Sequence, residues 1–382
     1  MEKHVLIKVY EDYLLLADPE ALEVLLAGVI ANYMEGLPVW LLYIGASGFG
    51  KSTVLEMFDG HERTYGLDEL TNKSLQSGLA DKSEEDNLVN LLDGKVALIS
   101  DLAQIINLKN TQGEIMAQLR RVYDGSLTKV WGSNKAPAKW EGQVGLIAAA
   151  TDAIDNKMSV FADLGERFNR VNVRGTKKHR KEAVRRARES IGRESEMRRA
   201  LREAGHSFLD RHIALAEGYE VDSSSEYNEQ LEVLADVTAN LRTPITGVKG
   251  GGFNHIPEPE YATRLVKQLG KLAKSNAMLD GEHHIGANNM ELVLRVAVDA
   301  IPRNRIWIIS ALINGAKNRA EISRYSNIPA STLKNEVDKL QALNILHLPD
   351  GKIALLADVE EDLIDSGIAD KMTRLYPAKE LK

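Results

Sequence analysis

The stretch from Tyr43 to Thr53, YIGASGFGKST, constrains this chain more than any other part of its sequence. Its spacing is G-x-x-x-x-G-K-S, with glycines inside the loop and a lysine and a serine at its end. The apolar run VWLLYI before it predicts a buried strand, and the run TVLEMF after it predicts the start of a helix. A strand, a glycine-rich loop and a helix, in this order, are the context in which such a motif binds phosphate. The sequence therefore predicts a phosphate-binding loop, and a chance glycine-rich turn is the weaker interpretation.

The motif also predicts what each kind of residue does. Glycines let the backbone curl so that its N–H groups point inward at phosphate oxygens, and the helix N-terminus adds a dipole that favours anions. Lys51 can reach the β- and γ-phosphates, and Ser52 can be a ligand of Mg²⁺. We expect ATP and Mg²⁺ as cofactors, with ATP held by Gly45, Ala46, Ser47, Gly48, Phe49, Gly50, Lys51, Ser52 and Thr53.

The composition excludes several classes of protein. With 382 residues, of which 44% are hydrophobic and 27% charged, the chain has the make-up of a globular protein of two or three domains. Cysteine is absent, which excludes disulfides and thiolate metal sites and agrees with a cytoplasmic location. No apolar run is long enough to span a membrane, and the N-terminal MEKHVLIKVYEDYLL is unlike a signal peptide. We expect no membrane partner.

The charge is unevenly distributed along the chain. The whole chain has a net charge of −7, but residues 176–202 contain 11 Lys or Arg and 4 Glu, a net charge of +7. The rest of the chain therefore carries −14. A basic element on an acidic body can meet a phosphate backbone, and it can equally be a solvated helical face.

A second predicted strand is followed directly by an aspartate. The run KVALIS, residues 95–100, predicts a buried strand, and Asp101 follows it directly. A P-loop ATPase uses an aspartate at the end of such a strand to hold Mg²⁺, together with the serine of the loop. Many of these enzymes place a glutamate next to activate water, whereas Leu102 stands here. The sequence therefore assigns Ser52 and Asp101 to Mg²⁺ and leaves the catalytic base open.

A β-hairpin is predicted between two further runs. Residues 126–131 and 139–149 have strand character, and the intervening GSNKAPA is rich in turn residues. Three lysines lie in this segment, with Lys135 near the tip, and they are candidates for contacts with a nucleic-acid backbone: Lys129, Lys135 and Lys139. An exposed turn lysine is the alternative interpretation of Lys135. The second strand ends at Thr151, whose hydroxyl could contact a γ-phosphate or the attacking water.

These blocks together resemble a known family. The order of P-loop, strand with Asp101, helix, hairpin, strand with Thr151 and the run LGERF resembles the AAA+ ATPases, in particular the branch with a β-hairpin before the sensor-1 strand. That branch includes minichromosome maintenance helicases and helicases of phages and mobile elements. The resemblance implies that Asp101 is the Walker B aspartate and that Thr151 is sensor 1. It also implies that Arg167 is an arginine finger acting on a neighbouring subunit, and that Arg264, in YATRL, is the sensor-2 arginine.

The C-terminal part predicts a winged helix-turn-helix. Helices are expected over residues 303–314, 320–325 and 331–343, and ILHLPDGKIALL then predicts a strand, a turn and a strand. The third helix would present four residues to a major groove: Ser331, Thr332, Lys334 and Asn335. Because Glu336 and Asp338 lie beside them, a winged helix that contacts protein is the alternative.

The predicted fold is α/β, with four segments. Residues 1–35 are expected to form a strand and a helix, 36–175 an AAA+ P-loop core, 176–300 a helical lid and linker, and 301–382 the winged helix. The leading functional hypothesis is a homo-oligomeric ring, a hexamer, that acts as an ATP-dependent DNA helicase or translocase. Two alternatives stay open: a nucleotide-switched DNA-binding regulator or helicase loader, and an ATPase of a defence or partner-remodelling system whose winged helix binds protein.

Overall fold

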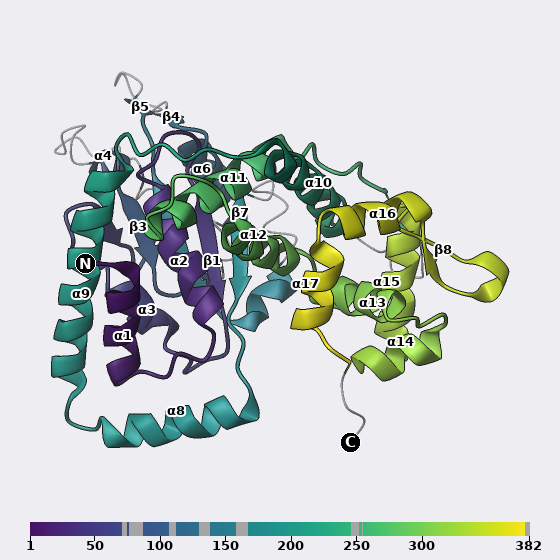
Figure 1. Cartoon of the computed structure of the whole chain (residues 1–382). Coiled ribbons are helices and arrows are strands. Elements are labelled where there is room, and N and C mark those ends of the chain that lie inside the picture. Colours follow the sequence, from purple (N-terminus) through teal and green to yellow (C-terminus); the bar gives the residue numbers. More distant parts are fainter. Residues whose placement is uncertain are drawn as a thin grey trace. The chain divides into compact units, whose positions relative to one another are not determined.

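The chain forms two compact units in the computed structural model (Figure 1), which describes residues 1–70, 75, 87–106, 112–129, 138–157, 167–245, 252–253 and 255–378. The first unit comprises residues 1–221 and 271–284, and the second comprises 222–270 and 285–382. The predicted α/β class is confirmed, because helices surround a parallel sheet in the first unit.

A five-stranded parallel sheet is the centre of the first unit, in the order β2-β3-β6-β1-β7. Strand β1 (Trp40–Ile44) is flanked by β6 (Gly145–Ala150) and β7 (Phe168–Asn172), and all three strands are buried along their whole length. Strands β3 (Val96–Ile99) and β2 (Thr64–Gly66) continue the sheet beyond β6. Parallel strands that are covered on both faces are expected to be continuous apolar runs, as the sequence of β1 is.

Helices cover both faces of this sheet. Side chains alternate along β1, so Trp40, Leu42 and Ile44 join the core cluster that α6 (Gln112–Tyr123) completes. Leu41 points to the other face, where a Cβ on Gly28 of α2 (Pro19–Ala31) would lie 3.1 Å from its side chain. The remaining helices of the first unit are α1 (Lys3–Tyr13), α3 (Lys51–Glu56), α4 (Leu88–Leu92), α5 (Leu102–Ile106), α8 (Lys177–Glu189), α9 (Glu194–Ala216) and the end of α11 (Thr263–Leu279).

The N-terminal segment is helical, which corrects the strand expected there. Residues 3–13 form α1, and its two buried side chains, Leu6 and Tyr10, are four residues apart. That spacing puts both on one face of a helix, and α1 packs with this unit's α9. The burial therefore comes from helix-on-helix packing and not from a place in the sheet.

The predicted hairpin strands are present in part. Strands β4 (Ser126–Lys129) and β5 (Ala138–Glu141) form an antiparallel ribbon in which Leu127 is paired with Trp140. The single second strand predicted over 139–149 is divided, because residues 142–144 leave the ribbon and β6 then joins the parallel sheet. The turn between β4 and β5, including Lys135, lies outside the described residues.

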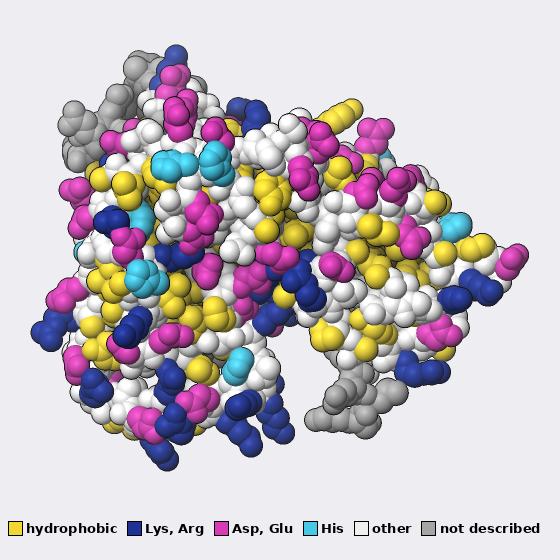
Figure 2. Space-filling model, in the orientation of Figure 1, with side chains coloured by type: hydrophobic (Ala, Val, Ile, Leu, Met, Phe, Trp, Pro, Cys, Tyr) yellow, Lys and Arg dark blue, Asp and Glu magenta, His cyan; other side chains and the backbone are white. Residues whose placement is uncertain are grey.

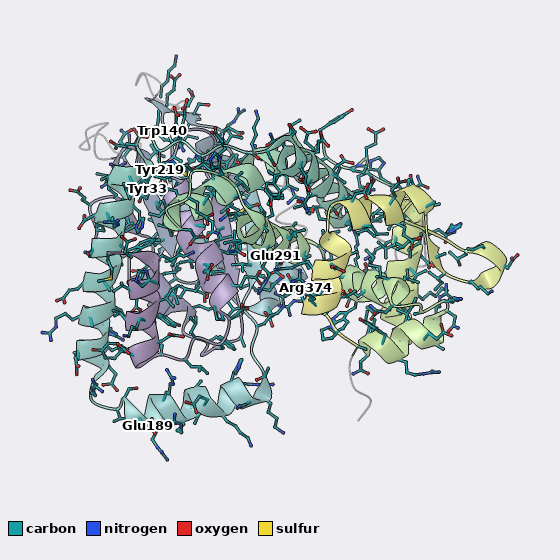
Figure 3. The ribbon with its side chains drawn as sticks, in the orientation of Figure 1. Tyr33, Trp140, Glu189, Tyr219, Glu291 and Arg374 are labelled. Carbon is teal, nitrogen blue, oxygen red and sulfur yellow. The ribbon has the colours of Figure 1, made fainter. Side chains whose placement is uncertain are left out.

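The second unit is helical apart from one small hairpin. Its elements are α10 (Ser225–Arg242), the start of α11, α12 (Ala287–Ala300), α13 (Arg303–Ile313), α14 (Arg319–Ser326), α15 (Ala330–Ala342), β8 (Leu346–His347), η3 (Pro349–Gly351), β9 (Ala354–Leu355), α16 (Ala357–Asp365) and α17 (Ile368–Leu375). The three helices and the hairpin predicted from 303 onward are confirmed as elements. Helix α17 is fastened to α12, where Arg374 donates to Glu291 at 2.8 Å (Figure 3). Among the described residues, no helix combines the length and apolarity needed to cross a bilayer.

Candidate nucleotide-binding site

The loop between β1 and α3 has the predicted setting. Strand β1 ends at Ile44 and α3 begins at Lys51, so strand, loop and helix follow in the expected order. Gly48 and Gly50 have φ angles of 78° and 75°, in the left-handed region that glycine adopts without strain. The N–H of Gly45 donates to the carbonyl of Ala150 at 3.1 Å, which fastens the start of the loop to the end of β6.

The loop is also packed against the chain that follows β7. A Cβ on Gly45 would lie 3.2 Å from that of Val173, and a Cβ on Gly175 would lie 2.3 Å from the ring of Phe49. On another side, the hydroxyl of Tyr10 would be 3.4 Å from a Cβ on Gly50. These close approaches hold the loop in one shape, so its backbone is positioned by its neighbours and not only by its own sequence.

Lys51 lies folded across the loop. Its side chain is buried, with 9% of the residue exposed, and its Nζ donates to the carbonyl of Ala46 at 2.8 Å. Burial lowers the pKa of Lys51, while the charges of Asp152 and Asp101 act in the opposite direction. The ammonium group of Lys51 thus lies against the loop, where the charges of Asp152 and Asp101 act on it.

Asp101 follows β3 at the predicted position. Its Oδ1 accepts a hydrogen bond from the N–H of Ala103 at 3.0 Å, so the aspartate caps the first turn of α5. Leu102 is buried in the core cluster. The position after Asp101, where many P-loop ATPases have a glutamate, is therefore used here for packing.

The strand ends bring the other polar residues to one edge of the sheet, called here the carboxyl edge. Strand β6 lies between β1 and β3, with Ala150 opposite Ile44 and Ala148 opposite Ile99. Thr151 and Asp152 follow β6, and Asp152 is exposed at the start of the short helix η2 (Asp152–Lys157). Strands β2, β3 and β6 lie on one side of β1 and β7 on the other, and ligands of such sheets bind outside the carboxyl ends where the strand order reverses.

Asp152 is a candidate residue that is absent from the sequence prediction. The motif draws attention only to the position after Asp101, which is a leucine, and to Thr151, which follows β6. A carboxylate within two residues of a strand end at the carboxyl edge is the sequence signal that marks Asp152.

Arg167 is placed differently from an arginine finger. It precedes β7, whose Phe168 lies opposite Trp40, so it is at the edge where β1 begins, roughly 16 Å from the P-loop along a five-residue strand. Its side chain is 7% exposed, and its Nη2 donates to both carboxylate oxygens of Asp124 at 2.8 and 2.7 Å. A finger must extend from its own subunit, whereas this guanidinium is buried and paired. The predicted finger stays a prediction that this geometry does not favour.

The remaining predicted residues lie on other elements. Arg264 belongs to the second unit, where its Nη1 is 4.0 Å from Glu260, so its sensor-2 role stays a prediction. Lys139 is exposed on β5, and nothing is described of the side chain of Lys129.

Three of the four residues predicted to face a major groove are exposed on α15, and the groove contact itself stays a prediction. Ser331, Lys334 and Asn335 are exposed and Thr332 is half-buried. The two neighbouring acids have basic partners within their own unit, since Glu336 pairs with Lys339 at 2.6 Å and Asp338 lies 3.8 Å from Arg319. The negative charge beside the exposed residues is therefore partly neutralised.

The residues available for Mg²⁺ suit the way P-loop proteins hold it. Mg²⁺ takes phosphate oxygens and waters together with only one or two side chains. Ser52 is exposed in the first turn of α3, and Asp101 lies at the same edge, so both are of the right type. Within the described part of the chain, no group of three or more metal-ligating side chains comes together.

Comparison with known proteins identifies no family whose model matches this chain and no curated protein that is similar to it.

Proposed function

We propose that this chain is an ATPase of the AAA+ type that acts on DNA, with the leading form a ring-shaped helicase or translocase. The observation that carries the proposal is the gathering of Lys51, Asp101 and Thr151 at the carboxyl edge, around a loop with the geometry of a phosphate cradle. The carboxyl ends of the strands and the reversal of strand order point to the same place.

ATP would enter with its phosphates along residues 45–52. Lys51 then exchanges its bond to the Ala46 carbonyl, 2.8 Å long, for bonds to phosphate oxygens, which are stronger because the acceptor is charged. Ser52 and Asp101 would hold Mg²⁺, which neutralises charge on the β- and γ-phosphates. Burial disfavours the charged form of Lys51. The negative charge of a bound phosphate would therefore stabilise the protonated side chain.

Asp152 is our candidate for the carboxylate that orients or deprotonates the attacking water. It is exposed at the carboxyl edge directly after Thr151, and its charge acts on Lys51. Leu102 occupies the usual position of that carboxylate and is buried. A neighbouring strand end would then supply the group that the strand of Asp101 lacks.

The test of nucleotide binding is Lys51→Ala, followed by isothermal titration with ATP and Mg²⁺. The variant is expected to lose tight binding, because the motif delivers no other cation to the β- and γ-phosphates. Lys8→Ala is the matched control, since Lys8 is an exposed lysine of α1. Equal ATP affinity in the wild type and Lys51→Ala would refute a P-loop function.

The action on DNA is supported by the β4–β5 ribbon and by the C-terminal elements. Three helices followed by a small hairpin have the order of a winged helix, and α15 exposes Ser331, Lys334 and Asn335. Lys135→Ala is expected to keep basal ATP turnover and to lose displacement of a strand from forked DNA. Unwinding at the wild-type rate would remove the hairpin from the mechanism.

The second candidate is a nucleotide-switched DNA-binding regulator or a helicase loader. Leu102 favours it, because a P-loop protein without an effective water-activating carboxylate hydrolyses slowly and can serve as a switch. ATP turnover that DNA stimulates without any strand displacement would select this candidate. Rings seen by electron microscopy with ATP and DNA, with density for a strand in the pore, would select the helicase.

A further inference from the structure

Helix α8 has two faces of different character. On one face the charges are paired within the helix, since Arg185 lies 2.5 Å from Glu182 and 2.8 Å from Glu189, which Figure 3 labels. The other face is exposed and follows the three- and four-residue spacing of a helix: Lys177, Arg180, Lys181, Val184 and Arg188. Within the described part of the chain, no carboxylate lies within ion-pair distance of Lys177, Arg180 or Lys181. We call this second face the cation face.

The cation face is not explained by the stability of α8. The first turn has no acidic residue, and cations there oppose the helix dipole. Arg180 and Lys181 are also three and four residues after Lys177, a spacing at which like charges repel. In addition, α8 contains no buried residue, so packing contributes little to holding it. These charges are arranged at a cost to the helix, and an external anion would offset that cost.

The helix is nevertheless fixed to the body of the first unit. Arg186 donates to the carbonyls of Glu11 and Leu14 at 2.8 and 2.9 Å, at the end of α1. A capping box of Thr176 and His179 begins the helix. The cation face is therefore presented by an ordered helix and not by a loose tail.

A second group of basic side chains follows at the start of α9. Arg198, Arg199 and Arg202 help to line a hollow of about 500 Å³, and another of about 440 Å³ lies along the cation face. Figure 2 shows Lys and Arg side chains gathered along the edge of the first unit where α8 lies. We call the cation face and the three arginines the α8–α9 basic surface.

The shape and charge of this surface define its ligand. An array along a 13-residue helix, about 20 Å long, and onward into α9 suits a polymer of regularly spaced charges better than a single phosphate. A helix that lies on a lipid surface needs a face of large apolar side chains, whereas α8 exposes only Val184 among its large hydrophobic residues. The negative charge of the rest of the chain would repel a polyanion elsewhere and direct it here.

We infer that the α8–α9 basic surface binds the phosphate backbone of nucleic acid without regard to sequence. The inference rests on the proposed function only in naming DNA as the partner, because this surface needs neither ATP nor the β4–β5 hairpin. Binding through phosphates makes affinity fall steeply with salt and leaves it indifferent to base sequence.

The test compares two double variants that remove the same charge. Lys177→Ala with Lys181→Ala changes the cation face, and Arg185→Ala with Arg193→Ala removes two arginines that are paired with Glu182, Glu189 and Glu196. Binding of labelled single-stranded and duplex oligonucleotides is measured by fluorescence anisotropy, without nucleotide, from about 50 to 200 mM salt. The cation-face variant is expected to flatten the slope of log K against log salt by about two, one for each lysine. The control variant is expected to keep the wild-type slope.

Equal slopes in the two double variants would overturn the inference, because the effect would then follow net charge and not contact. Loss of binding to anionic vesicles or to a polyglutamate peptide, with DNA binding retained, would also overturn it and assign the surface to that partner. Circular dichroism, and a second variant with Lys177→Gln and Lys181→Gln, separate a lost contact from a lost helix. Lys51→Ala is expected to bind DNA as the wild type does, so a failure of the ATPase proposal leaves this result standing.

Discussion

Asp152 is the single residue on which the proposed hydrolysis depends most. We expect Asp152→Asn to bind ATP within about threefold of the wild type and to lower the turnover rate about a hundredfold, the size of a lost general base. ATP titration and steady-state phosphate release measure the two quantities.

Asp155→Asn is the control for this substitution, because Asp155 lies on the same short helix and pairs with Arg170 at 2.7 Å. If both variants lose turnover equally, the effect belongs to the folding of η2 and Asp152 is not the base.

Substitutions of Arg167 and Asp124 distinguish a structural role of Arg167 from a catalytic one. If their bidentate pair is structural, Arg167→Ala and Asp124→Asn should both destabilise the protein, by about 1–3 kcal/mol, because Asp124 remains partly exposed. Urea unfolding measures this. If Arg167 is instead a finger, only Arg167→Ala should stop turnover, and mixing it with Lys51→Ala should restore part of the activity in shared interfaces.

Lys271 is a buried lysine, and folding changes the pKa of its side chain. Its Nζ donates to the carbonyls of Gly36 and Leu37, and burial lowers the pKa of Lys271 to about 8 from an ordinary value of 10.5. The unfolded chain therefore holds this proton more tightly between pH 8 and 10.5. Relative to Lys271→Met, the wild type should gain stability as pH rises through that window, by at most about 3 kcal/mol. Stability that changes equally in both proteins would show that Lys271 is not perturbed.

Substitutions of two helical glycines test whether packing of α9 against the end of α3 supports the P-loop. A Cβ on Gly205 of α9 would lie 2.1 Å from the carbonyl oxygen of Met57, the residue directly after α3. Gly205→Ala should therefore displace α3, cost about 1–3 kcal/mol of stability and weaken ATP binding. Gly113 of α6 has no atom within 4 Å of its Cβ position, so Gly113→Ala should be neutral or stabilising. Thermal unfolding and ATP titration of the pair decide the matter, and equal behaviour would refute the close contact.

At the level of elements, the sequence predicted those helices, strands and loops that are determined by the residues within them. The β1–loop–α3 unit and the helices from 303 onward were predictable, because glycines, apolar spacing and turn residues specify them directly. The helix α1 was not, since its apolar residues also suit a strand and only packing against α9 decides between them. The break at residues 142–144 was missed for a similar reason: strand character continues from β5 into β6, and the two strands differ in the partners with which they pair.

At the scale of the whole molecule, contacts between residues far apart in the chain could not be predicted from the sequence. The burial of Arg167 depends on Asp124, 43 positions earlier, and the place of Asp152 depends on β6 lying between β1 and β3. Residues 176–300 were predicted to form a helical lid and linker, whereas α8 and α9 group with the sheet in the first unit. Apolar periodicity shows that a helix has a buried face but not which element covers it.

The position of β1 between β6 and β7 has a consequence for synthesis of the chain. Both of its partners come late, because β6 begins at Gly145 and β7 ends at Asn172. At about 5–20 residues per second, the ribosome needs roughly 6 to 25 seconds to make the residues between Ile44 and Asn172. During that time the apolar strand WLLYI has no sheet to join, so its first encounters are with a chaperone, with α2 or with another nascent chain. The candidate nucleotide-binding loop that follows β1 packs against residues that come after β7. It can therefore take its final shape only when β7, the last strand of this sheet in the sequence, has left the ribosome.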